Sequence, residues 1–412
     1  MKVYHANEIA CLPRIDEIVP NESTMPSRNY FNLAMSFVLQ IHITDSCNLS
    51  CVHCYNHGSS VQHMDFDLFA KTVDEFLELA SLFRMRPTIL LSGGEPLMHP
   101  QFFTMLDYIT KKIDDGFPII LRILTNGILV NEPTIAESLL IQRKYIYEMQ
   151  VSIDGDKDVH NQIRSEGAWE KAIKAIGVIG QVLNISVAVS CVVSRMNYKV
   201  VSQIVENAVE NHVRRINFSR FVPVKGEGET NLRDMVLSED ELRVTWETLY
   251  GLSDKLLSNV ISGKSNTYIN MHRCDLWHLA DEQRAKQQWD VVGVPRYLLQ
   301  GLRCMVGANI IAVMPSGDVY PCRRLPTKIG NISKEKMKDI WMNNQFLKDM
   351  RNRGEHMTGK CKHCVFLKDR RYRMLCSGGG ACITTSLGGS IYDPDPQCWK
   401  RVQQRTGETN DV

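Results

Sequence analysis

Short apolar runs alternate with amphipathic stretches along the first half of the chain. Each run has the length of a buried strand, and the stretches between the runs repeat their apolar residues at helical spacing. Such an alternation predicts an α/β fold with a parallel sheet. In one stretch, the apolar residues that share a helical face are Phe69, Val73, Phe76, Leu77 and Ala80. The predicted strands span residues 39–44, 88–91, 119–124, 149–153, 185–193 and 216–221.

The pattern changes after the last of these strands. Residues 223–229 have the sequence Pro-Val-Lys-Gly-Glu-Gly-Glu, which is typical of a loop. A helix is predicted to begin at Ser238, because Glu241 stands where a capping-box partner would stand. We therefore expect four parts: an N-terminal extension (1–35), a barrel-like domain (36–222), a helical bridge (223–300) and a cysteine-rich domain (301–412).

Three cysteines follow the first predicted strand directly. Cys47, Cys51 and Cys54 have the spacing Cys-x3-Cys-x2-Cys on one loop. A structural zinc ion would need a fourth protein ligand, whereas a four-iron cluster held by three thiolates keeps one iron open for a co-substrate. The spacing favours an iron–sulfur cluster, while a zinc knuckle or a chance group of buried thiols stays open at this point.

Polar motifs stand at the ends of the next three predicted strands. They are Gly93-Gly94-Glu95-Pro96, Thr125-Asn126-Gly127 and Ser152-Ile153-Asp154-Gly155, and the last is followed by His160 and Arg164. Parallel α/β sheets and barrels place their active sites at the carboxyl ends of the strands. We therefore expect the motifs and the cysteine loop to meet at one edge of the sheet.

The cysteine spacing and these motifs, among them the pattern SxDGxxxxHxxxR, resemble the radical S-adenosylmethionine (SAM) enzymes over residues 36–222. The resemblance implies an open parallel (β/α)6 partial TIM barrel. It also implies that Cys47, Cys51 and Cys54 hold a [4Fe-4S] cluster whose open iron binds SAM. In this family an electron from the reduced cluster cleaves SAM to methionine and a 5′-deoxyadenosyl radical, which abstracts a hydrogen atom from an unactivated carbon.

The same resemblance assigns the residues that hold SAM. Glu95 would bind the amino group of the methionine part, and Arg164 would bind the carboxylate or the ribose. Asp154 is a further candidate whose alternative role is to cap a turn at the end of its strand. The full set implied by the resemblance is Gly93, Gly94, Glu95, Asn126, Ser152, Asp154 and Arg164.

A second set of cysteines occupies the last third of the chain, and its order resembles the SPASM domain, which carries auxiliary iron–sulfur clusters. The resemblance implies two such clusters, expected to be [4Fe-4S]. The outer cluster would be held by Cys361, Cys364, Cys376 and Cys398, and the inner one by Cys304, Cys322 and Cys382. The stretch 315–322 is typical of a hairpin turn that delivers a cysteine.

The cysteine spacing departs from the family pattern in the loops beside Cys376, so loop geometry does not transfer. The inner set also lacks an obvious fourth ligand. Cys274 is the nearest upstream candidate, but it is equally interpreted as an ordinary buried thiol. Without it, the inner cluster would have an open iron. Cys11 and Cys191 are expected to be buried thiols outside the clusters.

Composition limits the location and the partners. A formal net charge of +2 and 23% charged residues give no general basic field, so no nucleic-acid partner is expected. No apolar stretch has membrane-spanning length, and the N-terminus lacks the features of a secretion signal. Thirteen cysteines in such a chain indicate metal ligation in a reducing cytoplasm.

The resemblance leads us to expect oxidative modification of a ribosomally made precursor peptide, for example by cross-linking. Expected partners are the peptide, a separate peptide-recognition protein, and an electron donor such as flavodoxin or ferredoxin. Alternatives are a sulfatase-maturing enzyme that forms formylglycine, and an enzyme acting on a tetrapyrrole or another small molecule. An iron–sulfur electron carrier is the non-enzymatic alternative, but it would not need the SAM-binding motifs.

Overall fold

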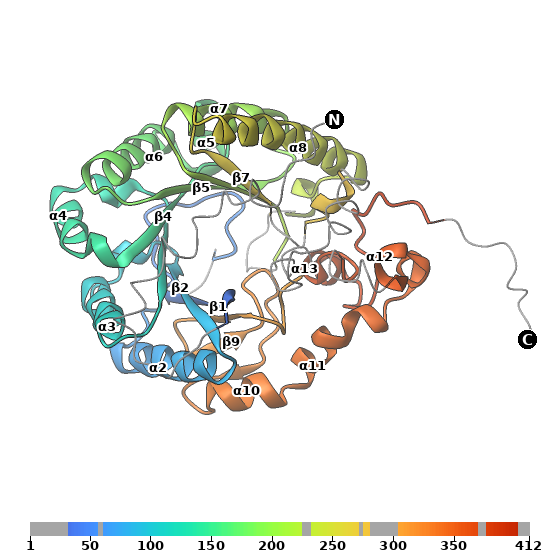
Figure 1. Cartoon of the computed structure of the whole chain (residues 1–412), viewed down its shortest axis with the longest axis horizontal. Helices are drawn as coiled ribbons and strands as arrows, with labels where there is room; N and C mark the ends of the chain where they lie inside the picture. The colour runs from blue at the N-terminus through green and yellow to red at the C-terminus, as the bar shows by residue number, and fades with distance from the viewer. Residues whose placement is uncertain are drawn as a thin grey trace, which may run out of the picture.

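A run of parallel strands forms the centre of the protein (Figure 1). The computed structural model describes residues 32–56, 61–224, 232–271, 275–280, 304–369 and 376–402. In sheet order the parallel run is β1 (Asn32–Thr44), β2 (Met85–Gly93), β3 (Ile120–Thr125), β4 (Ile146–Ser152), β5 (Val187–Val193), β6 (Arg215–Arg220) and β7 (Tyr268–Met271). All six predicted strands are present, and β7 adds a seventh from the predicted bridge.

Helices cover the outer face of this sheet and form the rim seen in Figure 1. The predicted apolar face of α2 is buried, from Phe69 to Ala80. The capping box at Ser238 and Glu241 begins α8, as predicted. The helices of this layer are α2 (Phe66–Leu82), α3 (Phe102–Asp114), α4 (Pro133–Gln142), α5 (Lys157–Arg164), α6 (Ala168–Gly177), α7 (Val201–Glu210) and α8 (Glu239–Ile261).

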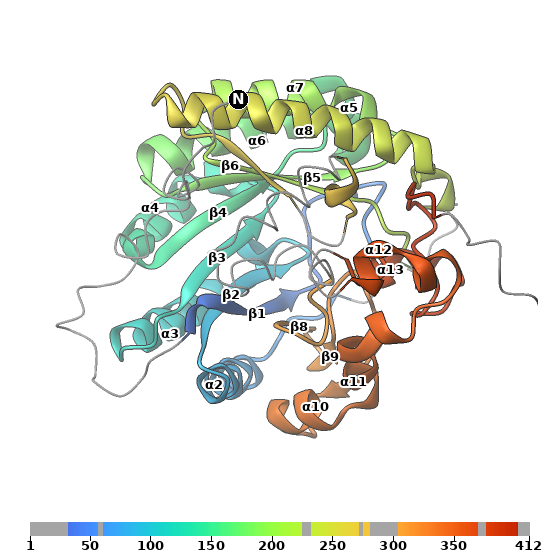
Figure 2. The same ribbon diagram turned by 45° about the vertical axis from the view of Figure 1, so that its right-hand side comes forward.

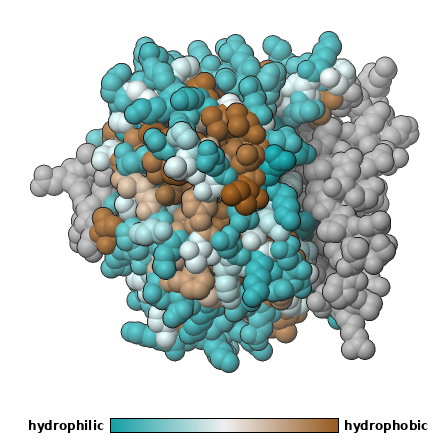
Figure 3. All heavy atoms as spheres, turned by 90° about the vertical axis from the view of Figure 1, so that its left-hand side faces the viewer, coloured by the Kyte–Doolittle hydropathy of each residue, from teal (hydrophilic) through white to brown (hydrophobic). Residues whose placement is uncertain are grey.

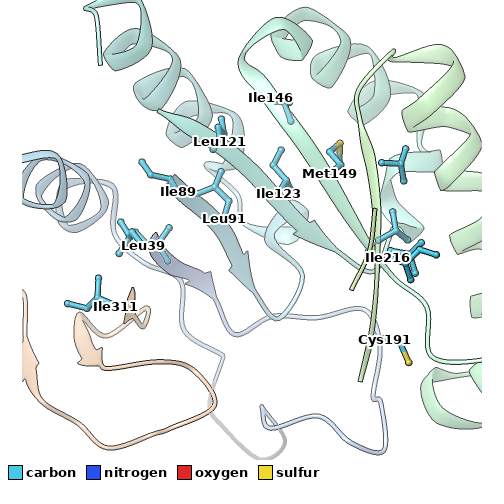
Figure 4. Packing of buried hydrophobic residues seen from close by; sticks show 14 of the residues in the cluster. Leu39, Ile89, Leu91, Leu121, Ile123, Ile146, Met149, Cys191, Ile216 and Ile311 are labelled. Atoms are coloured by element: carbon cyan, nitrogen blue, oxygen red, sulfur yellow. The ribbon is translucent and has the colours of Figure 1, made fainter. Parts of the chain in front are cut away.

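The apolar core lies between the sheet and these helices. Side chains from successive strands, among them Leu39, Ile89, Leu121 and Ile216, pack in one continuous layer (Figure 4). Cys191 of β5 belongs to the same core, which confirms its prediction as a buried thiol. The face seen in Figure 3 is polar around its margin and carries a patch of apolar side chains near its centre.

The C-terminal region continues the sheet of the barrel. Strand β8 (Ile310–Val313) pairs in parallel with β1, with Val38 opposite Ile310, and β9 (Asp318–Tyr320) pairs antiparallel with β8. Gly317 has a φ of 80° in the hairpin turn between β8 and β9, at the place where the sequence predicts one. Figure 2 shows β1, β8 and β9 side by side. The two cysteine-bearing regions therefore share one sheet, which ends at β10 (Gly330–Asn331).

Short helices complete the C-terminal region beside the hairpin (Figure 2). They are α10 (Met337–Asn343), α11 (Gln345–Asn352), α12 (Val365–Lys368) and α13 (Ala381–Ser386). None of the helices in the described ranges is long and apolar enough to cross a bilayer.

The inner face of the barrel carries polar side chains. Glu148 of β4 accepts a hydrogen bond of 2.9 Å from Nε of Arg215 on β6, and both side chains are buried. Asn217 accepts from Nη1 of Arg215 at 2.9 Å and from Nδ2 of Asn270 at 2.9 Å. Because buried polar groups need such partners, the network fixes strands β4, β6 and β7 relative to one another.

Candidate functional site

The cysteine loop after β1 runs close against the end of β2. The backbone N–H of Gly94 donates to the Thr44 carbonyl at 2.7 Å, and that of Glu95 donates to the Ser46 carbonyl at 2.7 Å. A Cβ on Gly93 would lie 2.3 Å from the Thr44 oxygen, and one on Gly94 would lie 2.3 Å from the Ser46 oxygen. Both glycines are therefore needed for this close approach, which holds the cysteine loop at the end of the barrel.

Glu95 is fully buried beside this loop. Its carboxylate accepts hydrogen bonds from the Thr125 hydroxyl at 2.8 Å and from the Asn126 backbone N–H at 2.8 Å. Burial raises the pKa of Glu95 to about 7, although these hydrogen bonds work in the opposite direction. The carboxylate therefore joins the ends of β2 and β3, and a nearby ammonium group would favour its charged form.

Asn126 connects β3 to the cysteine loop. Its side-chain amide donates to Oδ1 of Asn48 at 2.7 Å and lies 3.9 Å from Sγ of Cys47. Its own Oδ1 accepts from the backbone N–H of Ile128 at 3.0 Å. Both ends of the amide are thus used, and the side chain is fixed next to the first cysteine.

Asp154 and Arg164 meet at the second cysteine. Nε of Arg164 donates to Oδ2 of Asp154 at 2.7 Å, and Nη1 of Arg164 lies 3.7 Å from Sγ of Cys51. Oδ1 of Asp154 accepts from the backbone N–H of Val192 at 2.9 Å. Burial alone would raise the pKa of Asp154, but the charges of Arg164, His53 and His160 and the hydrogen bond from Val192 together outweigh it, and the pKa is lowered. The ionised carboxylate therefore orients the guanidinium beside the cysteine loop.

The fourth strand carries one more predicted residue, Ser152, whose half-buried side chain stands at the end of β4. The structure thus brings the predicted residues of β2, β3, β4 and α5 to the loop that bears Cys47, Cys51 and Cys54. Their roles toward SAM stay predictions.

The donor set of the loop fits an iron–sulfur cluster. The pKa of the Cys51 thiol is raised to about 11, chiefly by burial, while Arg164 lowers it and the charges of Cys54, Asp154 and Cys47 add to the rise. Only a cationic group could keep these thiols ionised together. Within the described ranges, no three His, Cys, Asp or Glu side chains are gathered to hold one metal ion. Three thiolates on one loop match a four-iron cluster that keeps one iron open, whereas a structural zinc ion takes four protein ligands.

The four cysteines of the predicted outer group interact with one another. Burial raises the pKa of Cys361 to about 12, and the charges of Cys376, Cys398 and Cys364 act in the same direction. Cys376 shows the same behaviour, with a pKa raised to about 12 by burial. Segments that lie far apart in the sequence therefore bring together the donors expected for one cluster.

A buried arginine shapes the loop between Cys376 and Cys382, and sequence reasoning missed it. Arg353 donates from Nη1 to the carbonyls of Ser377 and Gly379, each at 2.8 Å, and from Nε to the Ile391 carbonyl. Arg353 is fully buried. Arg353 donates to the carbonyl groups of the glycine-rich turn and so holds the turn in place. No local motif in the sequence predicts this contact.

Cys304, Cys322 and Cys382 form the predicted inner group. Burial raises the pKa of Cys322 to about 12, and the charges of Cys382 and Cys304 raise it as well. The carboxylate of Asp275 also acts on Cys382. Cys274, the candidate fourth ligand, and Cys11 lie outside the described residues.

A buried ionic network joins the inner group to the barrel. It was not predicted from the sequence. Nε of Arg220, at the end of β6, donates to Oδ1 of Asp275 at 3.0 Å, and Nη1 donates to Oδ1 of Asp395 at 2.9 Å. Arg324 donates to Oδ2 of Asp275 at 3.1 Å and to the Arg220 carbonyl at 2.9 Å. Arg220, Asp275 and Asp395 are all buried. The available signal in the sequence was a charged residue, Arg220, within the predicted strand 216–221.

Comparisons with family models agree with this geometry. Residues 41–208 match the radical SAM superfamily, and residues 304–365 match the SPASM iron-sulfur cluster-binding domain. An AdoMet-dependent heme synthase of Methanosarcina barkeri is 28% identical, over 86% of this chain and 94% of its own. The mycofactocin maturase MftC of Mycolicibacterium smegmatis is 23% identical, over 86% of this chain and 81% of its own.

Solved structures show the same fold. Streptococcus suis SuiB bound to S-adenosylmethionine superposes with a TM-score of 0.65 at 16% identity, covering 89% of this chain and 78% of that one. The structure of anSMEcpe with bound AdoMet and the Kp18Cys peptide gives a TM-score of 0.65 at 19% identity, covering 88% of this chain and 94% of that one. The chain is an enzyme of the radical SAM superfamily with a C-terminal SPASM iron–sulfur cluster-binding domain.

Proposed function

We propose that this enzyme oxidatively modifies a precursor peptide at an unactivated carbon–hydrogen bond. The main support is that Glu95 at the end of β2, Asn126 at the end of β3 and Arg164 of α5 all contact the cysteine loop. An electron carrier would not need this arrangement. When bound, the first cluster and SAM supply one-electron cleavage of SAM and hydrogen-atom abstraction.

The residues of the chain have separate tasks in this proposal. Cys47, Cys51 and Cys54 hold the first cluster. Glu95, whose pKa is raised to about 7 by burial, binds the ammonium group of SAM as a carboxylate. Arg164, kept in place by Asp154, binds the SAM carboxylate or ribose. Gly93, Gly94, Asn126 and Ser152 shape and line the same pocket.

The C-terminal cysteines would take up the electron that the substrate loses. Support comes from Tyr55, a half-buried side chain that follows Cys54 and whose ring centroid lies 3.7 Å from Cζ of Arg323, the residue after Cys322. Tyr55 is therefore close to both the first cysteine loop and the inner group. We propose two auxiliary clusters, an outer one on Cys361, Cys364, Cys376 and Cys398, and an inner one on Cys304, Cys322 and Cys382, whose fourth position is either Cys274 or an open iron.

The peptide substrate is supported by the likeness to a protein named mycofactocin maturase, which spans most of both chains. A cytoplasmic electron donor such as flavodoxin or ferredoxin would reduce the first cluster, and a separate recognition protein could present the peptide. A tetrapyrrole is the second candidate, since the heme synthase of Methanosarcina barkeri is 28% identical and 94% of it is covered.

The test is anaerobic co-expression with the short peptides encoded beside this gene, followed by intact-mass measurement. We expect the loss of two hydrogen atoms with the wild-type enzyme and no loss with the variant Cys47→Ala/Cys51→Ala/Cys54→Ala. Fragmentation then locates the new bond. An unchanged peptide, together with conversion of Fe-coproporphyrin III by the same preparation, would replace the peptide with a tetrapyrrole as substrate.

A further inference from the structure

Three side chains gather between the first cysteine loop and the inner cysteine group. His42 lies near the end of β1, Tyr55 follows Cys54, and Arg323 follows Cys322. The Cζ atom of Arg323 is 3.7 Å from the centroid of the Tyr55 ring, and the centroids of His42 and Tyr55 are 6.3 Å apart. Nη2 of Arg323 donates to Oδ1 of Asn56 at 3.0 Å. The group therefore connects three segments at the mouth of the barrel.

Polar atoms of this group are buried without a partner. The side chain of His42 is fully buried, and neither ring nitrogen has a hydrogen-bond partner in the described part of the chain. The same holds for Nε of Arg323. An unsatisfied buried polar group destabilises the folded chain, and an unsatisfied charged group does so more strongly. Such a cost is typical of a binding site, where a ligand supplies the missing partner.

The charges of the group favour an anion. Arg323 is a permanent cation, stacked on Tyr55, and among the described residues it forms no ion pair. The charge of Asp45 acts on Arg323, but the two side chains form no ion pair in the described part of the chain. Burial, reinforced by Arg323, keeps His42 neutral, because it lowers its pKa well below the ordinary value. One negative charge would therefore balance the site.

We propose that Arg323 and His42, beside Tyr55, bind a carboxylate group of the substrate. The planar fork of a guanidinium matches a carboxylate, and a neutral imidazole N–H can donate to the same group. This inference rests on the proposed function, because it places the substrate between the two cysteine regions. The carboxylate could belong to a peptide or to a porphyrin propionate, and the two sources are separated by the probes below.

The experiment measures equilibrium binding to the iron-reconstituted enzyme under anaerobic conditions. The first probe is Fe-coproporphyrin III, with its tetramethyl ester as the carboxylate-free partner. The second is a synthetic precursor peptide, prepared with its carboxylates free or amidated. We expect one free-acid probe to bind at least about tenfold more tightly than its ester or amide. The probe that shows this difference identifies the source of the carboxylate.

Variants then assign the effect to the side chains. Arg323→Gln is expected to weaken binding of the free-acid probe by about tenfold or more, and Arg323→Lys by less, because it keeps the charge but loses the fork. His42→Phe is expected to weaken it several-fold. Neither change should alter binding of the ester or amide. Arg243→Gln, an exposed arginine of α8, serves as the matched control and should bind like the wild type.

Several outcomes would overturn the carboxylate site. These are equal binding of acid and ester or amide, unaltered binding by the Arg323 variants, and failure of the wild type to bind any of the probes. The comparison of the free acid with the ester uses only the wild-type enzyme. It therefore tests the carboxylate site even if a variant does not fold. If the peptide is modified without any dependence on Arg323, this inference fails and the proposed function stands. If Fe-coproporphyrin III binds through Arg323 while no peptide is modified, the proposed peptide function fails and the site stands.

Discussion

The first cysteine loop and the C-terminal cysteine groups are built in different ways. Cys47, Cys51 and Cys54 lie within one short loop, and neutral or singly charged side chains at neighbouring strand ends support it. The C-terminal groups collect their cysteines from distant segments. Buried arginines, Arg220 and Arg353, hold those segments by carboxylates and backbone carbonyls. A local spacing thus defines the first site, whereas long-range ionic contacts define the second.

This difference has a thermodynamic meaning. A buried ion pair adds little stability compared with apolar packing, but the loss of one partner leaves an uncompensated charge. The C-terminal groups should therefore be more sensitive to a single substitution far from any cysteine than the first loop is. The following experiments test that contrast.

The largest effect is expected from Cys47→Ala/Cys51→Ala/Cys54→Ala. This variant should lose all SAM cleavage and the iron of the first loop, because the donors are gone, yet it should keep the iron of the C-terminal groups. Iron content and 5′-deoxyadenosine formation are the measurements. Cys191→Ala, which removes a core thiol outside the groups, is the control and should retain full iron. Persistent SAM cleavage in the triple variant would refute the central assignment.

Arg220→Met tests whether the C-terminal groups depend on the buried ionic network. It leaves Asp275 and Asp395 buried without their cation, which is expected to cost about 3–5 kcal/mol in the free energy of unfolding. In the triple-cysteine background, the same change should lower the C-terminal iron content. Denaturant titration and iron analysis measure the two effects. Arg243→Met, at an exposed ion pair of α8, should cost less than about 1 kcal/mol. Equal costs for the two variants would contradict the proposed role of the network.

Asp154→Asn sharpens the description of the first site. The amide cannot hold the charge of Arg164, so the guanidinium loses its orientation beside Cys51. We expect the dissociation constant of SAM to rise by about 10–100-fold, the usual effect of removing a residue that orients a ligand-binding side chain. Isothermal titration of the reconstituted protein measures it. Asp158→Asn, on the exposed side of α5, should bind SAM normally, and a normal affinity in Asp154→Asn would argue against this role.

The smallest effect concerns pH. Burial lowers the pKa of His160 to about 4, below its ordinary value of 6.5, so protonation favours the unfolded chain. The stabilisation is complete above pH 6.5 and is lost as the pH falls toward 4. From pH 6.5 to pH 5, His160 should account for about 2 kcal/mol of lost stability. His160→Gln should show a shallower decline than the wild type, whereas the exposed His356→Gln should follow the wild type. Parallel declines for all three proteins would exclude His160 as the source.

Sequence reasoning succeeded where the signal is local. The predicted strands are confirmed because each is a short apolar run, and their polar motifs stand at the carboxyl ends because parallel strands share one direction. The capping box at Ser238 needs only a neighbouring turn, and it is present. Cys191 was interpreted correctly from its position in an apolar strand.

The features that the sequence analysis did not predict depend on contacts between residues far apart in the sequence. Strand β7 has only four residues, Tyr268–Met271, with Asn270 pointing into a polar network, so it lacks an apolar signature. The pairing of β1 with β8 leaves no trace in either segment alone. The roles of Arg220 and Arg353 likewise depend on partners more than twenty residues away. His42 lies within an apolar strand, where its missing partners could only be seen in three dimensions.

The pairing of Val38 with Ile310 also has a consequence for biosynthesis. Chains fold as they emerge from the ribosome, with N-terminal parts first. One edge of β1 therefore stays uncovered until the hairpin that follows residue 310 has been made. Exposed apolar strand edges pair with other chains, so this nascent edge favours aggregation until it is covered. Slow translation or low temperature during expression should therefore alter the yield of soluble protein more than its final stability.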